Sequence, residues 1–212
     1  MRGKFISLEG TEGAGKSTVL KFISFYLTER NIQFVSTREP GGTELAEEVR
    51  ALLLHPKSSE YMEAETELLL MFAGRVQNLQ NRILPELAAG NWVISDRFID
   101  ASYAYQGGGR GIDASQIAML DNWLINDNYP DLTLLLDIPP EVGITRAEQR
   151  GTNKDRIEKE ALDFFNRVRD AYLMRAKNDP KRIKIVNANV SIAEVEQQLA
   201  QILDAFILGL EP

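Results

Sequence analysis

The segment Gly10–Ser17 reads Gly-Thr-Glu-Gly-Ala-Gly-Lys-Ser, and it constrains the fold more than any other part of the sequence. It lies between a short apolar run, Phe5–Leu8, and a segment with helical spacing, Ser17–Glu29. Glycines in a strand–loop–helix unit let backbone N–H groups converge on phosphate oxygens, and the start of the helix adds its positive dipole end. The lysine supplies charge for the β- and γ-phosphates, and the serine hydroxyl can bind Mg²⁺. The motif therefore predicts an α/β protein that binds a nucleoside triphosphate.

The rest of the chain continues the alternation of strand and helix. Strands are predicted at Phe5–Leu8, Gln33–Ser36, Trp92–Ser95, Leu132–Leu136 and Ile183–Val186. Helices are predicted at Ser17–Glu29, Glu44–Leu54, Ala64–Ala89, Pro140–Arg150 and Ala161–Asn178, and from a Ser191–Glu194 capping box to about Leu208. Short apolar strands joined by helices form parallel sheets that are covered on both faces. We therefore expect one α/β domain over residues 1–212, with a five-stranded parallel sheet.

Two local features qualify this pattern. Pro85 is expected to kink the long helix or end it early, because proline lacks the N–H that a helix interior needs. The glycine-rich run Gly107–Gly111 is too short for a linker and is expected to be a mobile or ligand-facing loop.

Composition excludes several classes of protein. The chain has 24 Lys and Arg against 31 Asp and Glu, a formal charge of −7, which disfavours general binding to nucleic acid or to anionic membranes. The absence of cysteine excludes disulfides, cysteine–zinc sites and thiol catalysis, and the single histidine, His55, excludes multi-histidine metal sites. No signal peptide or membrane span is predicted, so we expect a cytoplasmic protein.

Positive side chains outside the phosphate loop predict a second anionic substrate. Arg38 follows the second strand, and Asp96 and Arg97 end the third. Ligands of open α/β sheets bind at the carboxyl ends of the strands, where a guanidinium can bind a phosphate through two N–H groups. Asp96 could instead position Mg²⁺ or accept a proton. The segment 146–158, with Arg146, Arg150, Lys154 and Arg156, is expected to be a basic lid that closes over phosphates.

A further pair could recognise a nucleobase. Phe72 and Arg75 are three residues apart, so they share one face of the long predicted helix. An aromatic plane beside a guanidinium could stack on a base and form hydrogen bonds with it. The same spacing fits a core stripe that includes Leu68 and Leu79, and the sequence leaves both interpretations open.

Taken in order, seven blocks resemble the thymidylate (dTMP) kinase family of the bacterial type over nearly the whole chain. They are EGTEGAGKS, TREPGGT, LLMFAGRVQ, SDR, AYQGGGRG, PDLTLLLD and RAEQRG…DRIE. The resemblance implies the fold of the P-loop nucleoside-monophosphate kinases, with helices on both faces of the sheet and a short basic lid. It also implies phosphorylation of dTMP to dTDP with ATP and Mg²⁺, in dTTP synthesis, by a homodimer.

The resemblance also assigns roles to single residues. The ATP phosphates would be held by Gly10, Thr11, Glu12, Gly13, Ala14, Gly15, Lys16, Ser17 and Thr18. The dTMP site would comprise Glu12 facing the 3′-hydroxyl, Arg38 and Arg97 on the phosphate, Phe72 and Arg75 on the base, and Ser102, Tyr105 and Gln106 along the pocket. Ser17 and Asp96 would hold Mg²⁺, and Arg146, Arg150 and Arg156 would act from the lid. The catalytic set would be Lys16, Asp96, Arg97, Arg146 and Arg150.

Two positions depart from the family pattern. Phe98 stands where many relatives carry Tyr or His, and Ala101 stands where Ser is common. Two other functions fit the same motifs. One is a kinase that acts on a different nucleoside monophosphate. The other is a non-catalytic ATP-binding module, which would need no second set of phosphate-binding arginines.

Overall fold

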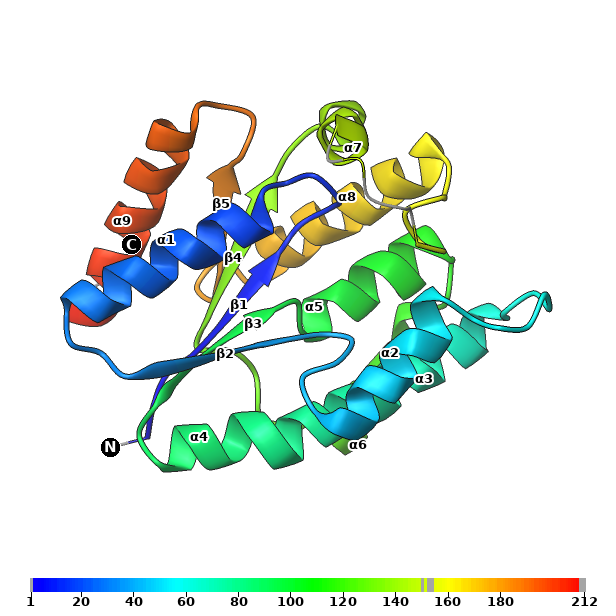
Figure 1. The fold of residues 1–212 in the computed structure, drawn as a ribbon, viewed down its shortest axis with the longest axis horizontal. Helices are drawn as coiled ribbons and strands as arrows, with labels where there is room; N and C mark the ends of the chain where they lie inside the picture. Colours follow the sequence, from blue (N-terminus) through cyan, green and yellow to red (C-terminus); the bar gives the residue numbers. More distant parts are fainter. Residues whose placement is uncertain (1, 150, 152–154, 210–212) are drawn as a thin grey trace.

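The computed structural model describes residues 2–149, 151 and 155–209. Its centre is a five-stranded, all-parallel sheet in the order β2-β3-β1-β4-β5 (Figure 1). The strands are β1 Phe5–Glu9, β2 Phe34–Arg38, β3 Trp92–Asp96, β4 Leu132–Asp137 and β5 Ile183–Asn187. The predicted fold class is confirmed, and each strand extends one or two residues beyond its expected end.

The helices surround this sheet. They are α1 Lys16–Glu29, α2 Glu44–Leu54, α3 Ala64–Asn78, α4 Leu84–Ala88, α5 Ile99–Ser102, α6 Ala114–Leu124, α7 Pro140–Gln149, α8 Leu162–Asn178 and α9 Ile192–Leu208, with π-helical turns η1 Leu79–Ile83 and η2 Tyr103–Gly109. The predicted capping box is present, because Ser191 and Glu194 each bond the other's backbone at the start of α9. The segments α5, η2 and α6 were not predicted.

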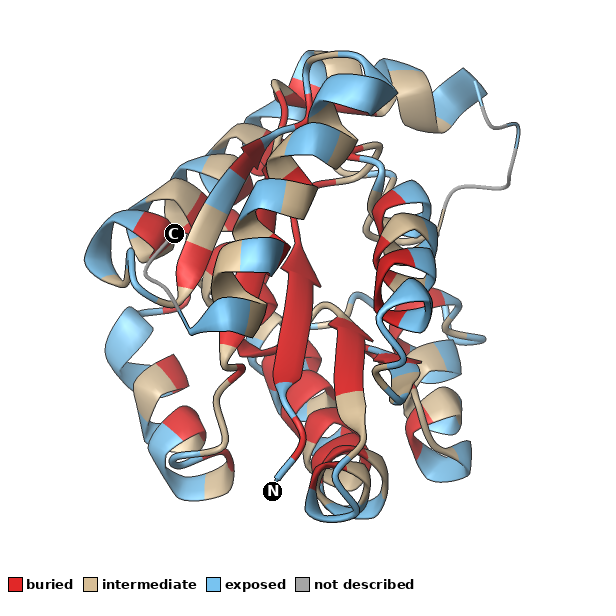
Figure 2. Cartoon of the chain, turned by 90° about the vertical axis from the view of Figure 1, so that its left-hand side faces the viewer, coloured by how far each residue is buried: buried red, intermediate tan, exposed pale blue. Residues whose placement is uncertain are grey.

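Both faces of the sheet are covered, because alternate strand residues point to opposite sides. Ile6 and Leu8 of β1 belong to a core with α1 and α9, which lie side by side on one face (Figure 1). Phe5 belongs to a second core on the other face of the sheet. There its ring packs edge-on against the ring of Phe98, with the two ring centres 4.9 Å apart. The inner strands β1, β3 and β4 are accordingly buried along most of their length, whereas the edge strands β2 and β5 are more exposed (Figure 2).

The long predicted helix is present, but its interior changes geometry. The α3 helix passes through the π-helical turn η1 into α4, so the path from Ala64 to Ala88 remains helical. Pro85 lies in the first turn of α4, where its missing N–H breaks the regular hydrogen-bond ladder. Such wider turns are a common response to an interrupted ladder.

The prediction of a mobile or ligand-facing loop at Gly107–Gly111 is wrong for residues 107–109. Residues 107–109 form the end of η2 and pack closely against α8. A Cβ atom on Gly108 would lie 2.7 Å from the Arg167 carbonyl oxygen, and one on Gly109 would lie 2.4 Å from the Phe164 ring. These glycines therefore serve close helix packing rather than flexibility.

The parallel register brings the functional ends of three strands to one edge. Asp96 of β3 lies opposite both Leu8 of β1 and Arg38 of β2. Glu9, Arg38 and Asp96 are therefore neighbours at the carboxyl edge of the sheet, where the phosphate loop begins. Of the helices in the described part of the chain, none combines the length and apolar character needed to cross a lipid bilayer.

Candidate active site

The phosphate loop is shaped by its glycines. Gly15 has φ 94° and caps the start of α1, and apart from its chain neighbours no described residue lies within 4 Å of where its Cβ would be, so the space beside it is open. Gly13 has φ 72°, and a Cβ there would lie 1.9 Å from the Gly143 carbonyl oxygen of α7. The loop therefore needs glycine at both positions, and no described group accepts from the backbone N–H groups of Lys16 and Ser17, which can bind an anion.

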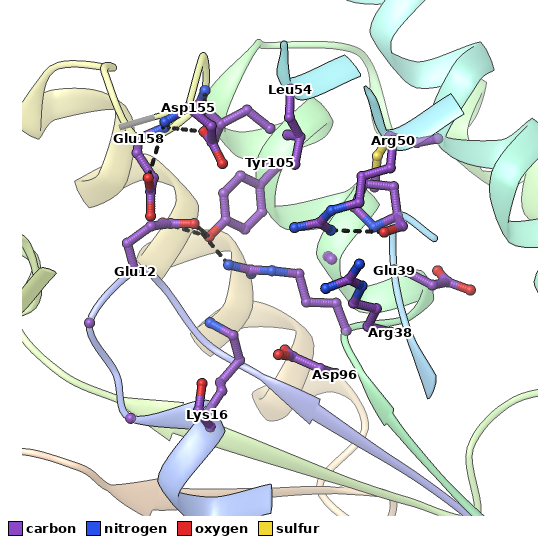
Figure 3. Close-up of a pocket in the computed structure, with 18 of the residues that line it drawn as sticks. Glu12, Lys16, Arg38, Glu39, Arg50, Leu54, Asp96, Tyr105, Asp155 and Glu158 are labelled. Atoms are coloured by element: carbon purple, nitrogen blue, oxygen red, sulfur yellow. Dashed lines mark hydrogen bonds and ion pairs between the residues drawn. The ribbon is translucent and has the colours of Figure 1, made fainter. Parts of the chain in front are cut away.

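Most of the predicted site residues line one cavity of about 420 Å³, a size within the range of small-molecule sites. Lys16, Arg38, Arg50 and Asp96 point into it from different elements (Figure 3). From the predicted set, the cavity walls include Glu12, Gly13, Gly15, Lys16, Ser17, Thr18, Arg38, Asp96, Arg97, Tyr105, Gln106 and Arg146. A triphosphate site and several candidate acceptor groups thus share one space.

Arg97 lies between the phosphate loop and the candidate acceptor groups of this cavity. Its Nη1 donates to the Gly10 carbonyl oxygen at 2.9 Å, and its Nη2 contacts Glu12 Oε1 at 2.8 Å. The Tyr105 hydroxyl donates to the same carboxylate. Arg97 has φ 71°, a left-handed conformation that costs energy for a non-glycine residue and that clusters at functional sites. The backbone is thus held in a strained turn that aims this guanidinium at the phosphate loop.

Tyr172 contacts Arg97 and links it to Glu9, and sequence analysis identified neither Tyr172 nor Glu9. Glu9 accepts hydrogen bonds from the Phe98 N–H and from the Tyr172 hydroxyl, both at 2.7 Å. The Tyr172 hydroxyl oxygen in turn accepts from Arg97 at 3.4 Å. Burial, helped by nearby Asp100, raises the pKa of Glu9 to about 8.

Arg50 is a further cation in the cavity that sequence analysis missed. It lies on α2, two turns beyond Thr43, and its Nη1 donates to the Pro40 carbonyl oxygen at 2.8 Å. Burial lowers its pKa, and the charge of Arg38 lowers it further. Arg38 itself is largely exposed and pairs with Glu47, 2.9 Å away. Sequence analysis looked for ligand-binding residues at the carboxyl ends of strands, and Arg50 lies within a helix instead.

The proposed base-stacking pair is buried, and Phe72 lies in a core cluster with Leu68 and Leu79, as the core-stripe interpretation predicts. The Arg75 side chain is fully buried, and it contacts Glu39 at 2.6 Å, the Ser102 hydroxyl at 2.7 Å and the Phe98 carbonyl oxygen at 3.0 Å. Its guanidinium lies 5.1 Å from the centre of the Phe72 ring. Phe72, Arg75 and Ser102 are not among the residues that line the cavity. Their roles on the base remain predictions.

The lid arginines are not brought together. Arg146 lines the cavity and donates to the Ala188 carbonyl oxygen at 3.0 Å. Arg156 contacts Glu67 and the Leu53 carbonyl oxygen and does not line the cavity, so the structure does not join it to the phosphate site. Arg150 and Lys154 lie outside the described residues. The described end of the lid presents Asp155, Ile157 and Glu158 to the cavity, which departs from the expected basic surface.

The residues expected to hold Mg²⁺ suit that ion. Asp96 Oδ1 is buried and has no hydrogen-bond partner among the described residues, and Ser17 lies in the first turn of α1, at the same cavity. The described residues contain no cluster of three or more acidic, histidine or cysteine side chains that could hold a metal alone. Hard oxygen donors in small number fit Mg²⁺, which usually also binds substrate phosphates.

Lys16 gives a testable pH dependence. Its ammonium donates to the carbonyl oxygens of Gly10 and Thr11 at 3.0 and 3.2 Å, and burial lowers its pKa to about 8, an effect that Arg97 increases. Below about pH 8 the ammonium is already charged. Above that pH, binding of a polyphosphate must also take up a proton, so affinity falls.

We therefore expect the affinity for ATP to fall above about pH 8, by at most ~10-fold per pH unit. Isothermal titration calorimetry between pH 7 and pH 9.5 measures this. In the Lys16→Arg variant, the affinity for ATP should change less with pH, because an arginine stays charged over this whole range. An affinity that is constant over this range would contradict the assignment of Lys16.

Comparisons with known proteins identify the family of this chain. Residues 8–199 match the thymidylate kinase family. The chain is 53% identical to the thymidylate kinase of Vesicomyosocius okutanii, covering 96% of this chain and 98% of that protein. It is 51% identical to that of Marinomonas sp., over 97% and 98% of the two chains. The crystal structure of thymidylate kinase from Ehrlichia chaffeensis superimposes with a TM-score of 0.77 at 34% identity, covering 96% of this chain and 99% of that one. These near-full-length matches show that the chain belongs to the thymidylate kinase family.

Proposed function

We propose that this protein transfers the γ-phosphoryl group of ATP to dTMP, giving ADP and dTDP. The observation that supports this most strongly is the meeting of the phosphate loop with Arg38, Arg50 and Arg97 at one cavity. A protein that only binds ATP would need no second set of guanidinium groups beside Lys16. A phosphoryl acceptor that already carries a phosphate needs them, because two polyanions must be held together.

Catalysis in this site is positioning and charge neutralisation. The acceptor phosphate oxygen is anionic already, so a general base contributes little. Lys16 and the N–H groups of the loop would hold the β- and γ-phosphates, and Arg97 would face the acceptor phosphate. Ser17 and Asp96 would hold Mg²⁺, which when bound neutralises charge on the β- and γ-phosphates. The cavity walls orient the two phosphates for in-line transfer.

Glu12 would bind the sugar of the acceptor. Its carboxylate is fixed by Arg97 and by the Tyr105 hydroxyl, at 2.8 Å from each. A carboxylate held in this way can accept a hydrogen bond from the 3′-hydroxyl. Tyr105 is buried against Phe164 and Tyr172, so it forms a rigid wall beside this position.

An ADP-release assay across the common nucleoside monophosphates tests the proposal. We expect dTMP to give the highest kcat/KM and ADP formation to require the acceptor. A preference for AMP, GMP or CMP would favour the alternative kinase. ADP formation that no acceptor stimulates would favour the ATP-binding module.

Arg50 provides a second test of the acceptor site. We expect Arg50→Met to raise the KM for dTMP about tenfold, with a smaller effect on kcat, because one charge-assisted contact to the phosphate is lost. The matched control is Arg82→Met on η1, a residue that does not line the cavity. Steady-state kinetics with saturating ATP measure both. An unchanged KM for dTMP in the Arg50 variant would remove this residue from the site.

We also propose a cytoplasmic homodimer, as the family resemblance implies. Large apolar side chains are half or more exposed on three adjacent helices: Leu45 and Leu52 of α2, Leu69 of α3, and Met119 and Trp123 of α6. Exposed apolar side chains on neighbouring helices are what a second copy of the chain would cover in a dimer. A monomer mass in multi-angle light scattering at micromolar concentration would refute the dimer.

A further inference from the structure

The amide group of Gln106 is held in one orientation. Its Nε2 donates to Glu67 Oε1 at 2.8 Å, and the side chain lines the cavity while being almost fully buried. Its other end, Oε1, is buried and accepts from no group among the described residues. An unpaired buried acceptor is costly, so it marks a place where a ligand donor is expected.

Glu67 decides which end of this amide is bonded to the protein and which end is left without a partner. The Glu67 side chain is 1% exposed, and it also contacts Arg110 at 3.1 Å and Arg156 at 2.6 Å. An ionised carboxylate only accepts hydrogen bonds, so it binds the NH₂ end of Gln106 and repels the oxygen end. The two guanidinium groups compensate its charge inside the protein. Gln106 is left to present a hydrogen-bond acceptor and not a donor.

We propose that Glu67 is a positioning residue that fixes Gln106 with its Oε1 toward the acceptor base, where it accepts the ring N–H. This inference rests on the proposed function and concerns its choice of base. Thymine carries a hydrogen at N3, whereas N3 of cytosine is an acceptor. A fixed oxygen therefore favours dTMP and leaves two acceptors facing each other when dCMP binds. Glu67 itself does not line the cavity, so it acts through Gln106.

The Glu67→Gln variant tests this directly. A glutamine at this position can donate to Gln106 Oε1, which lets the Gln106 amide turn and offer its NH₂ group to the cavity. We expect the ratio of kcat/KM for dTMP to that for dCMP to fall by about tenfold, mainly through a higher KM for dTMP. The ratio of dTMP to dUMP should not change, because both bases carry the N3 hydrogen.

Two further variants separate specificity from structure. Glu160→Gln breaks the other salt bridge of Arg110, 2.5 Å long, without touching Gln106, so it should keep the dTMP preference. Glu67→Asp retains an acceptor-only carboxylate and should restore most of the preference that Glu67→Gln loses. A general loosening of the fold would instead lower kcat/KM for dTMP and dCMP together.

If Glu67→Gln shows no thermal unfolding transition and is therefore not folded, Gln106→Met is used for the specificity test instead. This substitution removes the amide and leaves both salt bridges of Glu67 intact. An unchanged dTMP-to-dCMP ratio in either folded variant overturns the inference, and a fall supports it. Wild-type protein that does not use dTMP would refute the proposed function instead, so the two failures are distinguishable.

Discussion

Replacing Arg97 by methionine is expected to lower kcat by about 10³-fold while the protein stays folded. Arg97 is the residue through which the phosphate loop, Glu12 and the acceptor side of the cavity meet. The charge of Arg97 would lie beside the phosphoryl group during transfer, in a site shielded from water. Loss of this charge therefore raises the activation barrier for phosphoryl transfer, in addition to weakening the binding of dTMP. Rapid-quench measurement of a single turnover reports this step directly.

A second variant separates the contribution of the charge of Arg97 from that of its guanidinium geometry. Arg97→Lys keeps the charge but loses the second guanidinium contact, so we expect it to recover part of the rate. Arg82→Met again serves as a control outside the cavity. A kcat within tenfold of wild type in Arg97→Met would show that transfer does not depend on this guanidinium.

The second large effect concerns stability. Replacing Arg75 by methionine is expected to lower the free energy of unfolding by about 3–5 kcal/mol, because it leaves the buried carboxylate of Glu39 without its cation. Burial already raises the pKa of Glu39, and Arg75 opposes that rise. A substituted protein must therefore either bury an unpaired charge or take up a proton there. Urea unfolding at pH 7 measures the change.

Two comparisons make this result specific. The double variant Arg75→Met with Glu39→Gln should recover much of the lost stability, because no buried charge is left unpaired. Arg38→Met breaks an exposed ion pair and should change the free energy of unfolding by less than about 1 kcal/mol. A loss below 1 kcal/mol in Arg75→Met would show that the buried pair does not stabilise the fold.

The sheet and the phosphate loop could be predicted from sequence because their signals are local. The strands are short apolar runs, and the parallel arrangement follows from the helices between them. Lys16, Arg38, Asp96 and Arg97 were found by the same logic, since each lies in the loop or at a strand end and the register brings those ends together. Helix α6 also carries a local signal in the sequence, because Asp113 caps its start.

The missed features depend on contacts between distant parts of the chain. The glycines at 107–109 suggest flexibility locally, but only the approach of α8 shows why a side chain is excluded there. Arg50 carries no spacing that distinguishes it from the other helix arginines of this chain. Glu67 and Gln106 are 39 residues apart, and no local pattern indicates that they meet.

The two departures from the family pattern have different consequences. Phe98 is fully buried and packs edge-on against Phe5, so this side chain belongs to the core rather than to the cavity. Ala101 does line the cavity, so at that position the absence of a hydroxyl removes a polar group from its wall.

The most direct test is a crystal structure of this protein with dTMP and a non-hydrolysable ATP analogue bound together. The account predicts the β- and γ-phosphates against Lys16 and the start of α1, and the dTMP phosphate between them and Arg97, with Arg38 and Arg50 beside it. A dTMP phosphate bound outside this cavity, or turned away from Arg97, would contradict the account.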